Sequence, residues 1–240
     1  MNASALSRMY HSRIFRSIVV ILGLIALTCV GLVAWFVPGF AIREAASSGN
    51  LGVIKVLLAC NHHLVSTGDA FGQTPLHYAA SNGQIKAATL LLANGADVEA
   101  KTDLGATPLD MAAGAGNKNM IELLLANHAD INGRDRDGFQ QSPLFGAVIN
   151  HHRDMAKLLL TNHADVNAKD KDGTTPLHLA VSAAFYQHDK QMIELLLTNH
   201  ADVNAKGKEG TPLHMAVEYK MNDVEMNDVV ELLRAHGGQE

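Results

Sequence analysis

The stretch Thr74–Val98, which reads TPLHYAASNGQIKAATLLLANGADV, decides how this chain folds. Threonine before proline is a good N-terminal cap, and proline suits the first helical position because its missing N–H would have had no helical partner there. We therefore expect a helix to begin at Pro75. The apolar side chains within Leu76–Ala80 share one helical face, and after a break at Gly83 a second apolar stripe runs over Ile85–Leu92. The stretch predicts two short helices that form a hairpin.

The same pattern recurs along the chain with a nearly constant period. Thr-Pro-Leu or Ser-Pro-Leu returns with proline-to-proline steps of 33, 35, 33 and 36 residues, at Pro75, Pro108, Pro143, Pro176 and Pro212. A second marker, Leu-Leu-Leu followed by Asn-His-Ala-Asp, keeps the same phase and ends at Asn132, Asn167 and Asn204. One hairpin cannot bury its own apolar stripe, so the period predicts a stack of hairpins that share a continuous core.

Each second helix is expected to end at a residue that tolerates a left-handed backbone. The positions concerned are Asn61, Gly95, His128, His163, His200 and Gly237. Glycine, asparagine and histidine reach this conformation more readily than other residue types, as a helix C-terminal cap requires. Asp-Val-Asn or Asp-Ile-Asn follows, and then turn sequences such as Asp172-Gly173, which predict an extended finger between successive repeats. We expect Asn132, Asn167 and Asn204 to brace these fingers.

The repeated unit resembles the ankyrin repeat, whose signature is approximately DGxTPLHxAAxxGxxxxVxxLLxxGADVNA. The resemblance implies an all-α solenoid of helix-turn-helix repeats with β-turn or hairpin fingers. The expected repeats are about 42–72, 73–105, 106–138, 139–173, 174–210 and 211–240. In the degenerate first repeat Ala41–Glu44 replaces the TPLH tetrad, and a terminal repeat should carry a more polar outer face. We expect insertions in the helix-helix turn at Ala184–Lys190 and in the finger at Phe139–Gln141.

Residues 1–40 are a different kind of sequence. Ile18–Val37 holds 20 residues without a charge, enough for a helix to cross a hydrocarbon core of about 30 Å. Three arginines and no acidic residue precede it, whereas Arg43 beyond it is offset by Glu44. The positive-inside rule then predicts a signal anchor. Its parts are a basic cytoplasmic N-terminus (1–17), a transmembrane helix (18–37) and a short linker (38–41), with the repeats (42–240) on the exoplasmic side, periplasmic or extracellular.

A cleaved secretory signal is the alternative interpretation of the N-terminal segment. Small residues at Gly39–Ala41 would suit a cleavage site, and the chain would then be an exported, secreted ankyrin-repeat protein. The apolar run is longer than the 7 to 15 residues typical of a signal core, so the anchor is favoured.

Charge and cysteine content exclude several classes of partner and crosslink. Residues 41–240 hold 16 basic and 24 acidic residues, a net charge of −8. Nucleic-acid affinity comes mostly from neutralising phosphates, so we expect no nucleic-acid partner. Cys60 is the only cysteine outside the apolar segment, so an intramolecular disulfide within the repeats is excluded. We expect a half-buried thiol, with an intermolecular disulfide as the alternative.

The histidines do not form a metal-binding pattern. The tetrad histidines His77, His178 and His214 resemble the structural histidine of the family, and those at the helix caps lie one repeat apart. Packed helices are about 8–10 Å apart, whereas zinc needs nitrogens about 2 Å from one ion. The leftover groups, His151-His152 and Cys60–His63, supply too few ligands. We expect no metal and no cofactor.

Catalytic motifs are absent from the sequence, and the acidic residues Asp97, Asp130, Asp165 and Asp202 recur with the repeat. We expect no catalytic residue and no small-molecule substrate; an enzyme or metal protein built on the solenoid is the alternative of another class. The resemblance implies that another protein binds at the finger tips and on the exposed side of the first helices. On the fingers the candidates are Asp103, Leu104, Arg134, Arg136, Phe139, Lys169, Lys171, Lys206 and Lys208. On the helices they are Ser81, Asn82, Ile149, Asn150, Glu218 and Tyr219.

Overall fold

The computed structural model describes residues 38–133, 142–187, 190–220 and 226–239. The expected cytoplasmic segment 1–17 and transmembrane helix 18–37 lie outside this part of the chain. Within it, no helix combines the length and the apolar character needed to cross a membrane. Residues 42–240 form one compact unit.

Helices of two kinds alternate through the described residues, in six pairs. The first helices of the pairs are α2 (Pro38–Ser48), α4 (Pro75–Ser81), α6 (Pro108–Gly114), α8 (Pro143–Ile149), α10 (Pro176–Gln187) and α12 (Pro212–Lys220). The second helices are α3 (Leu51–Cys60), α5 (Ile85–Ala93), α7 (Lys118–Ala126), α9 (Arg153–Thr161), α11 (Lys190–Thr198) and α13 (Met226–Ala235). A short 3-10 helix, η1 (His62–Ser66), follows α3. The helical solenoid expected from the sequence is confirmed for this part of the chain.

The prolines start the first helices as expected. In α6, Thr107 and Asp110 form a capping box in which the Thr107 N–H donates to Asp110 Oδ2 over 2.7 Å and the Asp110 N–H donates to Thr107 Oγ1 over 3.3 Å. Such reciprocal bonds satisfy N–H groups at the start of the helix that have no helical partner. The register of the helices is therefore set locally, before stacking contributes.

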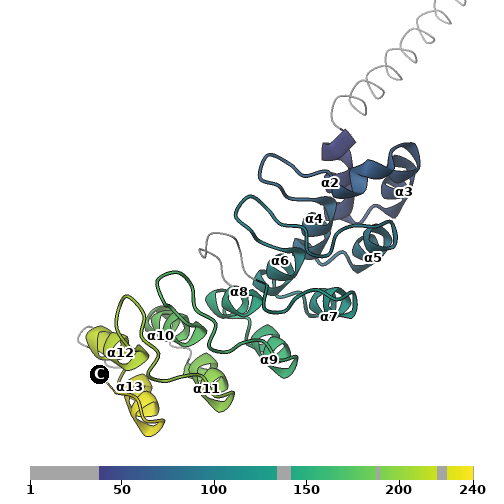
Figure 1. Cartoon of the computed structure of the whole chain (residues 1–240). Coiled ribbons are helices and arrows are strands. Elements are labelled where there is room, and N and C mark those ends of the chain that lie inside the picture. The colour runs from purple at the N-terminus through teal and green to yellow at the C-terminus, as the bar shows by residue number, and fades with distance from the viewer. Residues whose placement is uncertain (1–37, 134–141, 188–189, 221–225, 240) are drawn as a thin grey trace, which may run out of the picture. The chain divides into compact units, whose positions relative to one another are not determined.

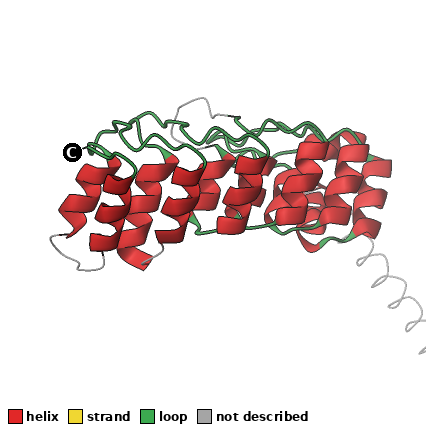
Figure 2. Cartoon of the chain, turned by 90° about the horizontal axis from the view of Figure 1, so that it is seen from below, coloured by secondary structure: helices red, strands yellow, loops and turns green. Residues whose placement is uncertain are grey.

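The first helices pack side by side in one row and the second helices in another, while long loops run along one edge (Figures 1 and 2). A leucine and an alanine at fixed positions of the first helices are buried in each repeat from the second onward. The leucines are Leu76, Leu109, Leu144, Leu177 and Leu213. The alanines, which allow close approach of neighbouring helices, are Ala79, Ala112, Ala147, Ala180 and Ala216. The core is thus continuous between repeats.

Asparagine side chains connect each repeat to the next at the base of the fingers. Asn132 Oδ1 accepts a hydrogen bond from the N–H of Asp165 over 2.8 Å, and Asn167 Oδ1 accepts one from Asp202 over 2.7 Å. Asn204 repeats the arrangement with Gln239 over 2.8 Å. The bracing role expected for these asparagines is confirmed, and the brace runs between repeats.

The first repeat differs from the sequence-based expectation. The helix α2 begins at Pro38, so the residues expected to form a linker, 38–41, make its first turn. Counted back from the glycines that follow α2 and α4, Ile42 takes the place of Leu76 and is equally buried, at 0% exposure. The degenerate tetrad is therefore one residue earlier than predicted. Arg43 falls at the histidine position, and its Nη1 donates to the Gly68 carbonyl over 3.1 Å, which attaches the helix to the next finger.

The outer side of the first repeat is not polar, contrary to expectation. Val53 is 39% and Val56 64% exposed on α3. Cys60 on the same helix is exposed as well, and the prediction of a half-buried thiol is wrong. At the other expected cap positions the backbone is left-handed, but Asn61 is extended, with φ −152°. Asn61 instead caps η1, since its Oδ1 accepts the His63 N–H over 3.1 Å.

The insertion in the fifth repeat lengthens a helix. We expected the extra residues in the turn at Ala184–Lys190, but α10 has 12 residues where α4 has 7. Phe185 in this extension stacks on Tyr219 of α12, with ring centroids 4.8 Å apart. The insertion expected at Phe139–Gln141 lies outside the described residues.

Candidate functional site

Two apolar side chains stand at the tips of neighbouring fingers. Phe71 is 68% exposed and Leu104 69% exposed, the two largest values among the large apolar residues of the described chain. The N–H of Asp103, next to Leu104, donates to the Phe71 carbonyl over 2.9 Å, so the two tips are joined directly. We call Phe71 and Leu104 the apolar tip pair. Apolar side chains that are exposed next to each other mark a candidate interaction site.

The finger that carries Phe71 is held rigid by one aspartate. Asp69 Oδ1 accepts the N–H groups of Phe71 and Gln73 over 2.8 and 2.9 Å. Its other oxygen accepts the Tyr78 hydroxyl of α4 over 2.8 Å, which attaches the finger to the first helix. A preorganised tip loses less conformational entropy when a partner binds than a flexible loop would.

Sequence reasoning identified Leu104 but missed Phe71. The signal was available, because each residue directly precedes the glycine of its finger, Gly72 or Gly105. Phe71 lies at the end of the degenerate first repeat, where the repeat pattern is hardest to align. The adjacency of the two tips could not be read from the sequence, since it depends on how the repeats stack.

Lysines occupy the fingers nearer the C-terminus. Lys169, Lys171, Lys206 and Lys208 are all exposed. The two fingers are connected by the N–H of Lys208, which donates to the Asp172 carbonyl over 2.8 Å, the same kind of contact that joins the apolar tips. The finger surface therefore changes along the solenoid from apolar tips to tips rich in lysine.

The helix residues predicted to bind have different roles in the structure. Ser81 is exposed and Ile149 is 43% exposed, which fits a contact surface. Asn82 and Asn150 are exposed, but each side chain bonds to its own helix, donating to Tyr78 and Gly146 carbonyls over 2.9 Å.

In the C-terminal repeat the predicted helix residues also contact other side chains of the chain. Glu218 lies 3.5 Å from His214 Nε2, and Tyr219 is half-buried against Phe185. Ser81 contacts the next repeat through its backbone, because its carbonyl accepts a hydrogen bond from Asn117 Nδ2 over 3.0 Å. The three remaining finger candidates, Arg134, Arg136 and Phe139, lie outside the described residues.

The tetrad histidines of the second and fifth repeats are structural. The Thr74 N–H donates to His77 Nδ1 over 3.1 Å, so Nε2 carries the proton and donates to the Ala106 carbonyl of the next finger over 3.0 Å. His178 makes the same contacts with Thr175 and with Gly210. Burial lowers the pKa of both histidines, which keeps them neutral.

The third tetrad histidine, His214, does not bridge repeats. It is exposed and faces Glu218, because the described residues hold no seventh finger whose carbonyl it could reach. At the same position of the third repeat the chain has Asp110, whose Oδ2 accepts the Thr107 N–H. Asp110 Oδ1 is enclosed without a hydrogen-bond partner, and burial raises the pKa of this carboxyl to about 6.

Five other histidines of the described residues have structural roles. His128, His163 and His200 have φ of 67° or 68°, as expected for left-handed caps. His151, with φ 58°, adopts the same conformation in the turn between α8 and α9, where α4 is followed by Gly83. His152 Nε2 lies 3.0 Å from the Gly114 carbonyl of the preceding repeat. No group of three or more histidine, cysteine or acidic side chains suited to a metal occurs in the described part of the chain.

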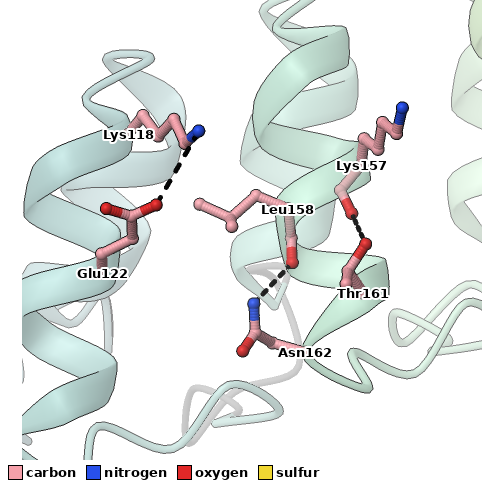
Figure 3. A network of polar contacts seen from close by, with 6 residues as sticks. All are labelled: Lys118, Glu122, Lys157, Leu158, Thr161 and Asn162. Atoms are coloured by element: carbon pink, nitrogen blue, oxygen red, sulfur yellow. Dashed lines mark hydrogen bonds and ion pairs between the residues drawn. The ribbon is translucent and has the colours of Figure 1, made fainter.

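The outer surface of α7 and α9 is polar. Figure 3 shows the neighbourhood of α7 and α9, where Lys118 and Glu122 lie 3.8 Å apart with both side chains more than half exposed. Thr161 and Asn162 bond back to carbonyls of their own helix over 2.8 and 2.9 Å (Figure 3). Exposed pairs of this kind contribute less than about 1 kcal/mol to stability. This surface offers a matched control for the finger surface.

Comparison with known proteins agrees with the repeat architecture. A family model described as ankyrin repeats (3 copies) matches residues 42–135 and 144–240. Human ankyrin repeat domain-containing protein 35 is 34% identical over 76 residues, which cover 32% of this chain and 8% of that protein. Human protein phosphatase 1 regulatory subunit 27 is 40% identical over 63 residues, 26% of this chain and 40% of the relative.

A Schizosaccharomyces pombe relative, palmitoyltransferase akr1, is 45% identical over 56 residues, 23% of this chain and 9% of the relative. The matched segments thus span less than half of each of these relatives. Ankyrin repeats are in general non-enzymatic modules that bind other proteins, and solenoids of this kind use the surface formed by their successive repeats. The two matched segments hold most of the residues of this chain, which belongs to the ankyrin repeat family.

Proposed function

We propose that this chain is a non-enzymatic scaffold, tethered to a membrane by residues 18–37, which binds a protein partner through its finger tips and the exposed side of its first helices. The observation that carries the binding function is the apolar tip pair, two large side chains exposed on joined and rigid fingers. Aromatic side chains are enriched among the residues that dominate binding energy, so Phe71 is the first candidate anchor.

Photo-crosslinking of the full chain in its native membranes tests the binding surface. A photoreactive amino acid at Leu104 should crosslink to one discrete partner, whereas the same group at Glu122, on the polar outer surface, should not. Adding Phe71→Ser to the Leu104 variant should reduce the crosslinked product at least tenfold, about 1.4 kcal/mol of binding free energy. The matched control is Lys118→Ser, which removes an exposed side chain from the outer surface.

A crosslink at Glu122 together with none at Leu104 would place the partner on the second helices and contradict the proposal.

A capture experiment tests the candidates Arg134, Arg136 and Phe139. Changing both arginines to glutamate and Phe139 to serine should weaken capture of the same partner at least tenfold, since arginine and aromatic side chains are frequent in interfaces.

The membrane tether is supported by the uncharged sequence of residues 18–37 and by the arginines that precede it. It puts the N-terminus in the cytoplasm and the repeats on the exoplasmic side. A cleaved signal and a secreted product are the alternative. N-terminal sequencing of the mature chain separates the two, because only the tethered form keeps residues 18–37.

A further inference from the structure

The helix α3 exposes side chains at positions that the other repeats bury. Val53, the third residue of α3, is 39% exposed. The third residues of the following second helices are between 0% and 7% exposed: Ala87, Met120, Met155 and Met192. Val56, the sixth residue, is 64% exposed, whereas its counterparts Leu90, Leu123, Leu158 and Leu195 are half-buried. The first repeat thus keeps the side chains of an internal repeat.

The covering group for this position comes from the preceding repeat. The last repeat shows this, because the matching residue of α13, Val229, is 4% exposed although no further repeat follows it in the described residues. The side of α3 that carries Val53 and Val56 therefore lacks the cover that stacking gives to the other second helices. The sequence of residues 18–37 is the uncharged run that we assign to the membrane, and neither of the two repeat markers occurs in residues 1–37.

The side chains of α3 indicate what kind of molecular surface could cover its exposed side. The ten residues of α3 include one charged side chain, the exposed Lys55 between the two valines in sequence, and no acidic one. Apolar side chains combined with a basic residue are typical of helices that lie at the boundary between lipid headgroups and acyl chains.

The covalent connection brings this helix near the bilayer if residues 18–37 span it. Four residues lie between Val37 and Ile42, which makes five steps along the chain. An extended chain covers at most about 3.6 Å per step, so Ile42 would lie within about 18 Å of the end of the span. The headgroup region on one side of a bilayer is about 5–8 Å thick. Among the repeats of this chain, the first is therefore the one that the anchor holds closest to the lipid.

We propose that the exposed side of α3, formed by Val53, Lys55 and Val56, rests on the phospholipid surface beside the membrane anchor. The proposal rests on the tether proposed above. In this proposal, lipid covers the side of α3 that a preceding repeat would otherwise cover. The contact would also orient the fingers relative to the bilayer.

The natural cysteines of the chain allow a direct test. Cys60 is exposed at the end of α3, one turn beyond Val56, and Cys29 can be replaced by serine. The full chain is inserted into vesicles of phosphatidylcholine and phosphatidylglycerol, 3 to 1, that include a lipid with a nitroxide on its headgroup. A fluorophore on Cys60 reports the contact. The matched control carries Cys60→Ser and Ala126→Cys, which places the label at the end of α7 in the third repeat.

We expect the nitroxide lipid to quench the Cys60 label at least threefold more than the Ala126→Cys label. Val53→Asp with Val56→Asp should lower quenching at Cys60 to the control level while circular dichroism stays unchanged. If the double variant unfolds, Lys55→Glu with Val56→Ser gives the same test with smaller changes. Equal quenching at both labels in carbonate-resistant vesicles would overturn the lipid contact and leave the tether standing.

Two other outcomes would also overturn the proposal. Release of the chain from the vesicles by carbonate would refute the tether, and the lipid contact with it. A Cys60 label that is shielded from aqueous iodide but is not quenched by the nitroxide lipid would mean that protein covers α3, either a partner or a second copy of the chain.

Discussion

Asp110 shows how one substitution within the repeat changes the chemistry of a buried position. Where the second and fifth repeats have a histidine that donates from Nε2 to the next finger, the third has a carboxyl whose Oδ1 has no hydrogen-bond partner. A buried carboxylate without a full set of donors is costly, which is the physical reason for the raised pKa. Asp110 is therefore a weak point of the stack at neutral pH.

We predict that Asp110→Asn stabilises the chain at neutral pH but not in acid. The folded-state pKa of about 6 lies above the ordinary value of 3.8, so the folded protein binds the proton more tightly than the unfolded one. The contribution of Asp110 to stability is then most favourable below about pH 4 and decreases as the pH rises through about 6. The advantage of the variant should grow over this window toward a limit of about 3 kcal/mol.

Urea unfolding of both proteins between pH 4 and pH 7.5 measures this difference. The buried histidines act in the opposite direction, because a lowered pKa means that their stability is lost as the pH falls below about 6.5. They are present in both proteins, so their effect cancels in the difference. A difference in unfolding free energy that does not change with pH would show that Asp110 is not the responsible group.

The capping histidines give a second prediction at this scale. Replacing His128, His163 or His200 with glycine should be neutral or raise stability by up to about 1 kcal/mol, because glycine reaches a φ near 67° without the steric cost of a side chain. Thermal unfolding measures it, and His163→Val should be clearly destabilising in parallel. A marked loss of stability in the glycine variants would mean that the imidazole has a role beyond capping.

At the scale of the element, the repeats differ in the hydrogen bonds that join each one to the next. Asn167 both accepts the Asp202 N–H over 2.7 Å and donates to the His200 carbonyl over 3.3 Å. In the second repeat Glu99 takes this place and accepts the Asp130 N–H over 2.8 Å, but an ionised carboxylate cannot donate. The repeats thus differ in how firmly they are joined at the base of their fingers.

We predict that Asn167→Ala lowers the free energy of unfolding by about 1–2 kcal/mol, since it removes both bonds. Asn167→Asp should cost less, because it keeps the acceptor as Glu99 does. Chemical denaturation of the two variants gives the comparison. If the alanine and aspartate variants lose the same unfolding free energy, the bond that Asn167 donates to His200 accounts for the whole effect. This result would contradict the prediction, which assigns part of the effect to the shorter bond from Asp202.

At the scale of the whole molecule, the proposed tether would decide on which side of the membrane the fingers meet a partner. We predict that alkaline phosphatase fused after Glu240 is active, because the arginines ahead of residues 18–37 keep the N-terminus in the cytoplasm and send the repeats across. The control reverses these charges. Changing Arg8, Arg13 and Arg16 to glutamate should reduce the alkaline phosphatase activity. Activity of a cytosol-dependent reporter at the same position in the parent would reverse the orientation.

A truncated chain tests whether the repeats fold without the anchor. A chain that starts at Pro38 should be helical and unfold cooperatively, since the buried residues of 42–240 form a continuous core. A chain that starts at Ile42 should be less stable, because it lacks the first turn of α2. Circular dichroism and thermal melting distinguish the two. A disordered product from Pro38 onward would show that the solenoid depends on residues 1–37.

The sequence by itself determined the repeat, the helix pairs and their caps, because these depend on residues a few positions apart. Proline after threonine starts a helix wherever it occurs, and histidine at the cap keeps its left-handed backbone. It also supplied Leu104 as a surface candidate. It misplaced the degenerate tetrad by one residue because the first repeat lacks the Thr-Pro-Leu marker that aligns the others.

Only the tertiary structure decided which side chains meet across a repeat. The joined tips of Phe71 and Leu104, the bond from Arg43 to the next finger, and the unpartnered oxygen of Asp110 all depend on stacking. The exposed side of α3 is of the same kind, because Val53 has the sequence pattern of a buried residue and is 39% exposed in the described residues, which hold no repeat before α2. Burial in a solenoid is set by the neighbouring repeat, about 33 residues away, and a local pattern cannot show whether that neighbour is present.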